Sequence, residues 1–215
     1  MAIVCEQAKV VYIAVPKVAC TSLKVFFYEI NNRVNWPSHR LSHALVHGYP
    51  GYATPDYKAE RLQNFTDYSK VAVIRDPVER VISAYKDKAR PVVLEGKGLK
   101  KPLAEAGLPT DPDPTTFCKN IQQYSDICPV IHSHIKPYRC FLGSDISAFE
   151  RLFKIEEISE MAEMMSAKLD RKVSVKKTNE SRSIEKTKSV AFSDENRKCL
   201  RDFCEKDYQF LSEYY

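Results

Sequence analysis

The N-terminal part of the chain alternates short apolar runs with amphipathic stretches. The run Lys9–Val15 is apolar and β-branched, which is typical of a buried parallel strand. A proline ends it, and apolar residues then recur at helical spacing over Leu23–Ile30. A second buried strand is predicted at Lys70–Ile74, and Pro77 begins the helix that follows it. The order strand–helix–strand–helix indicates an α/β domain with a largely parallel sheet.

Further elements are predicted from capping residues and periodicity. Thr21 or Ser22 is placed to cap the first helix, and Ser193 is placed to cap the last. The chain between the two strands is predicted as loops with one short helix near Pro55–Phe65. The remaining predicted elements are a strand over 149–155 and helices over 115–124, 129–140, 157–169 and 193–213.

Length and composition indicate one globular domain. A chain of 215 residues suits a single domain, 1–215, rather than two. Its 44% hydrophobic and 28% charged residues allow a buried core and exclude a disordered chain. Residues 89–114 contain five prolines and three glycines, so we predict a long, mobile surface loop or lid there.

The charge pattern says little about the ligand by itself. The formal charge of +5 favours an anionic ligand, but a solvated surface with a small basic surplus explains it equally well. No zinc-finger, RNP-like or basic-zipper pattern occurs, so we do not expect nucleic acid as a partner. Cys199 and Cys204 lie on a predicted helix and share a face poorly, so we expect no metal.

The sequence carries no targeting signal that we can identify. No run approaches the roughly eighteen apolar residues of a membrane span. The N-terminus has an early acidic residue and no basic region, which argues against a signal peptide. Seven cysteines without CxxC spacing predict reduced thiols. These features predict a cytoplasmic protein, with the Golgi lumen as the alternative if the sequence is a truncated form.

The first segment with ligand-binding chemistry is the turn Pro16–Ser22, PKVACTS. A strand that ends in a tight turn at a helix start presents backbone N–H groups and the positive end of the helix dipole to an anion. Lys17 adds an ammonium, and Thr21 and Ser22 add hydroxyls. The turn has no glycine and lacks GxxxxGK[ST] spacing, so it is not a Walker A motif. The residues alone leave open an anion-binding turn and an ordinary capped junction.

The second such segment is Val73–Tyr85, VIRDPVERVISAY. Arg75 lies at the carboxyl end of the predicted strand, where open α/β sheets bind ligands. Its guanidinium can hold a phosphate with two hydrogen bonds. Ser83 follows about two helical turns later. The alternative is that the Arg–Asp and Glu–Arg dipeptides of this segment form structural ion pairs, and the segment alone does not exclude it.

Together the two segments resemble a known family. PKVACTSLK is similar to the 5′-phosphosulfate loop of the carbohydrate sulfotransferases, and IRDPVERVISAYKDK is similar to their 3′-phosphate segment, RDPxxRxxSxY. The resemblance is closest to the Golgi chondroitin, dermatan and related sulfotransferases, and it spans residues 10–213. Four later pieces also resemble the family: HIKPYRC at 134–140, FERL at 149–152, NES at 179–181 and DYQF at 207–210.

The resemblance implies a fold, a cofactor and a reaction. The fold is an α/β, P-loop-like three-layer sandwich with a central, mostly parallel sheet flanked by helices. The reaction moves a sulfuryl group from 3′-phosphoadenosine-5′-phosphosulfate (PAPS) to a hydroxyl of a carbohydrate acceptor, without a metal. Golgi members carry a membrane anchor, and we expect none in this chain. Its short length predicts reduced acceptor-binding insertions.

The resemblance also implies which residues bind PAPS. Arg75 and Ser83 would hold the 3′-phosphate. The 5′-phosphosulfate would lie against six residues of the turn: Pro16, Lys17, Ala19, Cys20, Thr21 and Ser22. The basic tract with Lys176, Lys177 and Arg182 either closes over the cofactor or an acidic acceptor, or is a solvated face.

The expected chemistry is in-line transfer helped by electrostatic stabilisation. Lys17 and the N–H groups of the turn would stabilise charge on the bridging oxygen. Histidine is the default base near neutral pH. Of His43 and His47, we favour His47, because related uronyl sulfotransferases carry a histidine just before a glycine in a corresponding stretch. Either histidine can instead be a packed surface residue, an Asp or Glu base stays open, and His132 and His134 are candidate acceptor contacts.

Two other functions stay open. A P-loop nucleotide-dependent phosphotransferase would need a glycine-rich loop and an acidic metal ligand at a strand end, and neither occurs where required. A non-catalytic sulfotransferase-fold binding protein would keep the ligand contacts and lose turnover. Intact Lys17, Arg75 and Ser83 argue against the binder. The sequence names neither the acceptor nor the oligomeric state.

Overall fold

The chain is described by a computed structural model over residues 2–36, 42–96, 98–176 and 190–215, with the side chains of 42–44 and 61 excepted. It divides into two compact units, which we describe separately. The sheet unit comprises residues 1–75 and 138–181, and the helical unit comprises residues 76–137 and 182–215. Folding of 1–215 as a single sulfotransferase domain stays a prediction.

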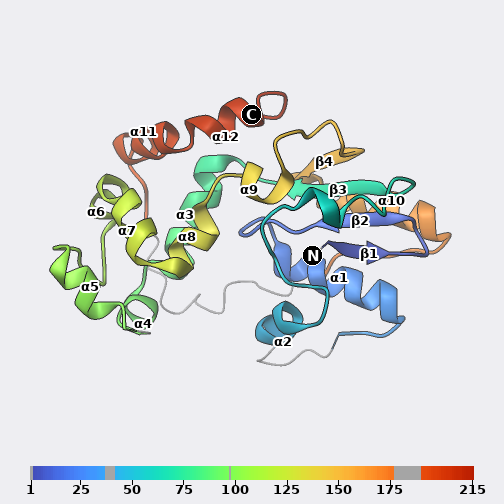
Figure 1. Ribbon diagram of the computed structural model, residues 1–215, viewed down its shortest axis with the longest axis horizontal. Coiled ribbons are helices and arrows are strands. Elements are labelled where there is room, and N and C mark those ends of the chain that lie inside the picture. The colour runs from blue at the N-terminus through green and yellow to red at the C-terminus, as the bar shows by residue number, and fades with distance from the viewer. Residues whose placement is uncertain (1, 37–41, 97, 177–189) are drawn as a thin grey trace. The chain divides into compact units, whose positions relative to one another are not determined.

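A four-stranded sheet organises the sheet unit (Figure 1). The order is β1-β2-β3-β4, with β1 antiparallel to β2 and the other pairs parallel. The strands are β1 (Ile3–Cys5), β2 (Val10–Ile13), β3 (Ser69–Ile74) and β4 (Arg151–Lys154). The predicted strands at Lys9–Val15 and Lys70–Ile74 are thus confirmed, and the α/β class with a mostly parallel sheet is confirmed with them.

Both faces of the sheet are covered. The ring of Tyr12 in β2 stacks on Phe27 with 5.0 Å between centroids. The neighbouring Ile13 lines a hollow together with Tyr57 and Phe141. Successive strand side chains point to opposite faces, so α1 covers one face, and the chain before η1 covers the other together with α9. The helices of this unit are α1 (Cys20–Asn32), α2 (Ser42–Gly48), η1 (Ala59–Arg61), α9 (Arg139–Leu142), η2 (Ile155–Glu157) and α10 (Ile158–Leu169). The finer, P-loop-like sandwich stays a prediction.

The helical unit is built around the α3 face that carries Val81 and Ile82, both buried. Asp76 caps α3 by accepting from Glu79 N at 2.9 Å, and Pro77 is its first residue, as predicted. The helices are α3 (Pro77–Lys88), α4 (Pro91–Leu94), α5 (Lys100–Glu105), α6 (Pro114–Lys119), α7 (Ile121–Ile127), α8 (Pro129–Ile135), α11 (Asp194–Phe203) and α12 (Glu205–Phe210).

The segment 89–114, predicted as a surface loop, is corrected in part. It contains α4 and α5, and Leu94 and Leu103 are fully buried in the core of the helical unit. The Tyr85 hydroxyl donates to the Pro112 carbonyl at 2.8 Å. The prolines and glycines therefore break the segment into short helices instead of keeping it irregular. Mobility of this segment stays a prediction.

The start of α1 also differs from its prediction. Its N-cap is Ala19, in a left-handed conformation (φ 61°, ψ 24°), with no side-chain capping bond. Thr21 and Ser22 lie inside the first turn, so the prediction that one of them caps the helix is wrong. The cap predicted at Ser193 is confirmed, because its side chain accepts from Asn196 N. Among the residues that the structure describes, no helix is long and apolar enough to cross a membrane.

Candidate functional site

The two predicted ligand segments begin at one edge of the sheet. β2 and β3 are parallel neighbours, with Ile13 paired to Ala72. The chain leaves β2 toward Lys17 and leaves β3 at Arg75, so both segments emerge from the carboxyl ends of adjacent strands (Figure 1). Neighbouring strands lie about 4.8 Å apart, and this edge is where open α/β sheets bind ligands.

The turn after β2 holds two residues in an unfavourable backbone conformation. Lys17 has φ 67° and Ala19 has φ 61°, both left-handed, and neither is glycine. Each such residue costs on the order of 1–2 kcal/mol. Strain of this kind is concentrated at ligand clamps and active sites. Pro16 is buried, whereas Lys17, Ala19 and Cys20 are half-buried. The turn thus keeps a costly shape, as expected of a segment selected for binding.

The helix that follows the turn presents an uncompensated N-terminus. α1 has no acidic side chain in its first turn and no capping side chain. By contrast, α6 carries Asp113 and α3 carries Asp76 as capping side chains. The positive end of a helix dipole and its first N–H groups attract anions. The combination of Lys17, a strained turn and this helix start can hold a phosphosulfate group.

Arg75 is fixed through its backbone by a buried tyrosine. The Tyr138 hydroxyl accepts a hydrogen bond from Arg75 N at 2.9 Å and donates to Arg75 O at 2.8 Å. Tyr138 has no exposed surface. It belongs to the HIKPYRC piece, so this part of the resemblance has a physical role, which is to set where the Arg75 side chain leaves the sheet.

Thr21 is brought together with His47 by α1 and α2. The Thr21 hydroxyl lies 3.0 Å from His47 Nε2, and Lys24 Nζ lies 2.9 Å from His47 Nδ1. Lys24 also donates to Thr54 Oγ1 at 2.7 Å, and its side chain has no exposed surface. The structure therefore groups the favoured base with one predicted phosphosulfate ligand and adds Lys24, which we did not single out from the sequence.

Burial lowers the pKa of Lys24 from 10.5 to about 8, against an opposing electrostatic influence from Cys20. The folded chain thus binds this proton less tightly than the unfolded chain, so stability rises with pH between about 8 and 10.5. Below about 8 the full penalty is present, on the order of 3 kcal/mol at 1.36 kcal/mol per pKa unit. The one sign of this burial in the sequence is that Lys24 lies on the apolar side of the predicted helix.

We expect Lys24→Met to increase the free energy of unfolding at neutral pH, because it removes this penalty. The gain should be below about 3 kcal/mol near pH 7, because His47 and Thr54 also lose a hydrogen-bond partner, and it should shrink above about pH 8. Urea denaturation of both proteins near pH 7 and near pH 9.5 measures the difference in free energy of unfolding at each pH. Titratable groups that both proteins share contribute equally and cancel from this difference. A variant that is less stable than the wild type at neutral pH would contradict the prediction.

Three other predicted residues belong to the helical unit. Ser83 is half-buried on α3 in the helical unit, and its role beside Arg75 stays a prediction. His132 Nδ1 lies 3.1 Å from Ser125 Oγ, and His134 Nδ1 lies 2.6 Å from the Val130 carbonyl.

The basic tract is only partly described. Lys176 pairs with Glu29 at 3.0 Å. Lys177 and Arg182 lie outside the described residues, and so does the side chain of His43.

Glu79 and Arg80 of the second segment form ion pairs within the helical unit. Glu79 pairs with Arg197 at 2.8 Å, and Arg80 pairs with Asp207 at 3.1 Å. The Glu79–Arg80 dipeptide therefore has a structural role, in which each residue pairs with a distant partner and not with its neighbour. Among the described residues, no group of three or more His, Cys, Asp or Glu side chains could hold a metal.

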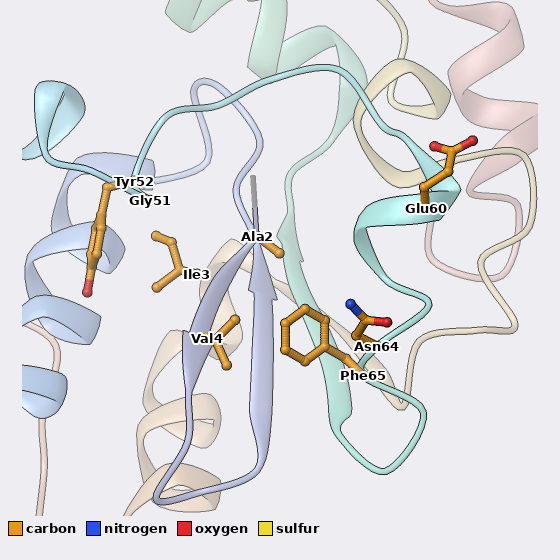
Figure 2. A pocket seen from close by; sticks show the side chains of 8 residues that line it. All are labelled: Ala2, Ile3, Val4, Gly51, Tyr52, Glu60, Asn64 and Phe65. Carbon is orange, nitrogen blue, oxygen red and sulfur yellow. The ribbon is translucent and has the colours of Figure 1, made fainter.

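A pocket of about 460 Å³ lies beside β1 (Figure 2). Ile3 and Val4 of β1 line it together with Tyr52, Glu60 and Phe65. None of its lining residues belongs to the two predicted ligand segments, so we do not assign this pocket to the predicted cofactor site.

Comparison with known proteins defines the class. A profile described as "Sulfotransferase family" matches residues 1–215, so the chain belongs to the sulfotransferase family. The family predicted from the two segments is thereby confirmed. Carbohydrate sulfotransferase 10 of Danio rerio is 32% identical over 89 residues, which is 40% of this chain and 24% of that protein. Carbohydrate sulfotransferase 10 of Gallus gallus is 31% identical over 94 residues, 40% of this chain and 25% of that protein.

The matched region spans about a quarter of the length of these curated relatives. No solved structure shows a significant match to the chain.

Proposed function

We propose that this protein transfers a sulfuryl group from PAPS to a hydroxyl of a carbohydrate acceptor. The observation that carries the proposal is the strained Lys17–Ala19 turn, which joins β2 to the uncapped α1 beside Arg75 at one sheet edge. Membership of the sulfotransferase family supports a sulfate donor, and the names of the two relatives support a carbohydrate acceptor. A cytoplasmic location stays a prediction.

The turn and the first turn of α1 would bind the 5′-phosphosulfate through backbone N–H groups, the Lys17 ammonium and the hydroxyls of Thr21 and Ser22. Arg75 would bind the 3′-phosphate, with Ser83 as its predicted second ligand. This donor set fits a dianionic group and needs no metal to neutralise it.

The proposed reaction is in-line. The acceptor oxygen bonds to sulfur while the bond from sulfur to the bridging oxygen breaks, and adenosine 3′,5′-bisphosphate leaves. Lys17 and the N–H groups would stabilise the charge that develops on the bridging oxygen. His47, beside Thr21, would take the proton of the acceptor hydroxyl.

Titration with adenosine 3′,5′-bisphosphate tests the cofactor. We expect it to raise the thermal midpoint of the protein, because a ligand that binds only the native state stabilises it by mass action. ATP with magnesium should not, and Lys17→Ala or Arg75→Ala should weaken the effect. Stabilisation by ATP in place of the bisphosphate would favour the phosphotransferase. Bisphosphate binding without turnover on a panel of saccharide acceptors would favour the non-catalytic binder.

A further inference from the structure

Both ring nitrogens of His47 contact side chains of one helix. Thr21 and Lys24 lie three residues apart on α1, which places them on the same side of the helix. Thr21 Oγ1 lies 3.0 Å from Nε2, and Lys24 Nζ lies 2.9 Å from Nδ1. A neutral imidazole carries its proton on one nitrogen only. The hydrogen-bond partner of Nδ1 therefore decides whether Nε2 is protonated.

The amine of Lys24 is the group that contacts Nδ1. Lys24 is fully buried, and Thr54 fixes its amine with a second hydrogen bond at 2.7 Å. The groups that face it are Cys20 from α1, His47 from α2 and the non-titrating Thr54 from the chain after α2. Among the described residues, no carboxylate forms an ion pair with Lys24. The ammonium is therefore held by hydrogen bonds to His47 and Thr54, and it can lose its proton without breaking an ion pair with a carboxylate.

The two protonation states of Lys24 have opposite consequences for His47. An ammonium can only donate, so Nδ1 must accept and the imidazole proton must sit on Nε2. A neutral amine can donate to Thr54 and accept from Nδ1–H, which leaves Nε2 unprotonated and able to accept from Thr21 or from an acceptor hydroxyl. Only this second arrangement lets Nε2 act as a base, since a nitrogen that already carries a proton cannot accept another without becoming a cation.

We propose that Lys24 is a positioning residue that selects the tautomer of His47, so that His47 Nε2 is a competent base only when the Lys24 amine is neutral. The inference rests on the proposed function, because it assigns His47 the role of base. It goes further by naming Lys24 as the group whose protonation decides whether His47 Nε2 can accept a proton. This role differs from phosphate binding.

The tautomer can be observed without any turnover. In protein labelled with ¹⁵N-histidine, with His47 assigned by loss of its signals in His47→Gln, we expect a proton on Nδ1 near pH 9 and on Nε2 near pH 7. In Lys24→Arg, a permanent cation, the proton should stay on Nε2 at both pH values. A tautomer that is the same in the wild type at both pH values would overturn the proposal.

Kinetics of two Lys24 variants separate this role from simple packing. Lys24→Arg keeps the charge and the donor, yet we expect its kcat to fall about 100-fold, the lower end of what a general base supplies. Lys24→Gln is neutral and can accept from Nδ1–H, so its kcat should stay within about tenfold of the wild type. The wild-type kcat should rise with pH around a midpoint near 8, and this rise should be absent in Lys24→Gln. A merely structural lysine would give the opposite order, with arginine the better substitute, and that order would overturn the proposal.

The controls distinguish the possible failures. Thermal midpoints and bisphosphate titration show whether each variant is folded and binds the cofactor product. If Lys24→Arg does not fold, the histidine spectra of the wild type and of Lys24→Gln still decide the tautomer. If the spectra behave as expected but His47→Gln keeps full kcat, the assignment of His47 as base fails while its coupling to Lys24 holds. If the bisphosphate does not bind the wild type, the proposed function fails independently.

Discussion

Replacing Arg80 with alanine is expected to lower the free energy of unfolding by about 3–5 kcal/mol, the largest stability effect that we predict for a single substitution. The guanidinium is fully buried and donates to the carbonyls of His134 at 3.2 Å, Ile135 at 3.4 Å and Lys136 at 2.9 Å. It also pairs with Asp207 at 3.1 Å. Its removal leaves a buried carboxylate and the carbonyls at the end of α8 without this donor, so the cost is mainly one of desolvation.

An exposed ion pair on the same helix provides the control. Arg197 pairs with Glu79 at 2.8 Å, with side chains 47% and 36% exposed, so Arg197→Ala should cost at most about 1 kcal/mol. Urea denaturation of both single variants measures the contrast.

The double replacement Arg80→Met with Asp207→Leu removes both buried charges. It should be much less destabilising than Arg80→Ala. Equal losses from Arg80→Ala and Arg197→Ala would show that the buried pair does not hold the helical unit together.

The same segment therefore carries both structure and predicted chemistry. In RDPVERVISAY, Asp76 caps α3 and also accepts from the Tyr208 hydroxyl at 2.8 Å, and Arg80 ties α3 to the ends of α8 and α12. Arg75 alone leaves the strand toward the edge where ligands are expected. Sequence could not separate these roles, because Asp207 and Tyr208 lie more than a hundred residues along the chain from Arg80 and Asp76.

Elements defined by strong local patterns were predictable. The apolar runs of β2 and β3 and the proline at the start of α3 each depend on neighbouring residues, and all three are confirmed. Elements that depend on tertiary packing were not. Strand β1 has only three residues and forms through its pairing with β2. The segment predicted as one final helix forms two, α11 and α12, which meet at the buried Cys204.

The candidate site shows the same division. Lys17, Thr21 and Arg75 could be chosen from the sequence because their local motifs mark a helix start and a strand end. Lys24 was missed, since a lysine on a helix is usually solvated even beside apolar positions. Its contacts with His47 and Thr54 come from a segment more than twenty residues away. The left-handed backbone at Lys17 was also hidden, because a turn without glycine gives no local sign of positive φ.

That backbone conformation allows the charge of Lys17 to be tested apart from the shape of the turn. Lys17→Gly removes the ammonium and also removes the strain at φ 67°, since glycine adopts left-handed conformations readily. We expect kcat to fall about 10²–10³-fold, as when one electrostatic donor is deleted from an active site. The thermal midpoint should stay the same or rise. Steady-state kinetics with PAPS and a saccharide acceptor, together with thermal unfolding, measure both quantities.

Lys9 supplies the matched control for this prediction. It is also a lysine with positive φ (52°), and it stands at the opposite end of β2, where it pairs with Asp67 at 3.3 Å and lies over the Tyr68 ring. Lys9→Gly therefore makes the same chemical change on the same strand, away from the edge that carries Arg75, and should leave kcat within about twofold of the wild type. If Lys17→Gly and Lys9→Gly have similar kinetics, the ammonium of Lys17 does not act on the leaving oxygen, and catalysis must come from the backbone of the turn and from α1.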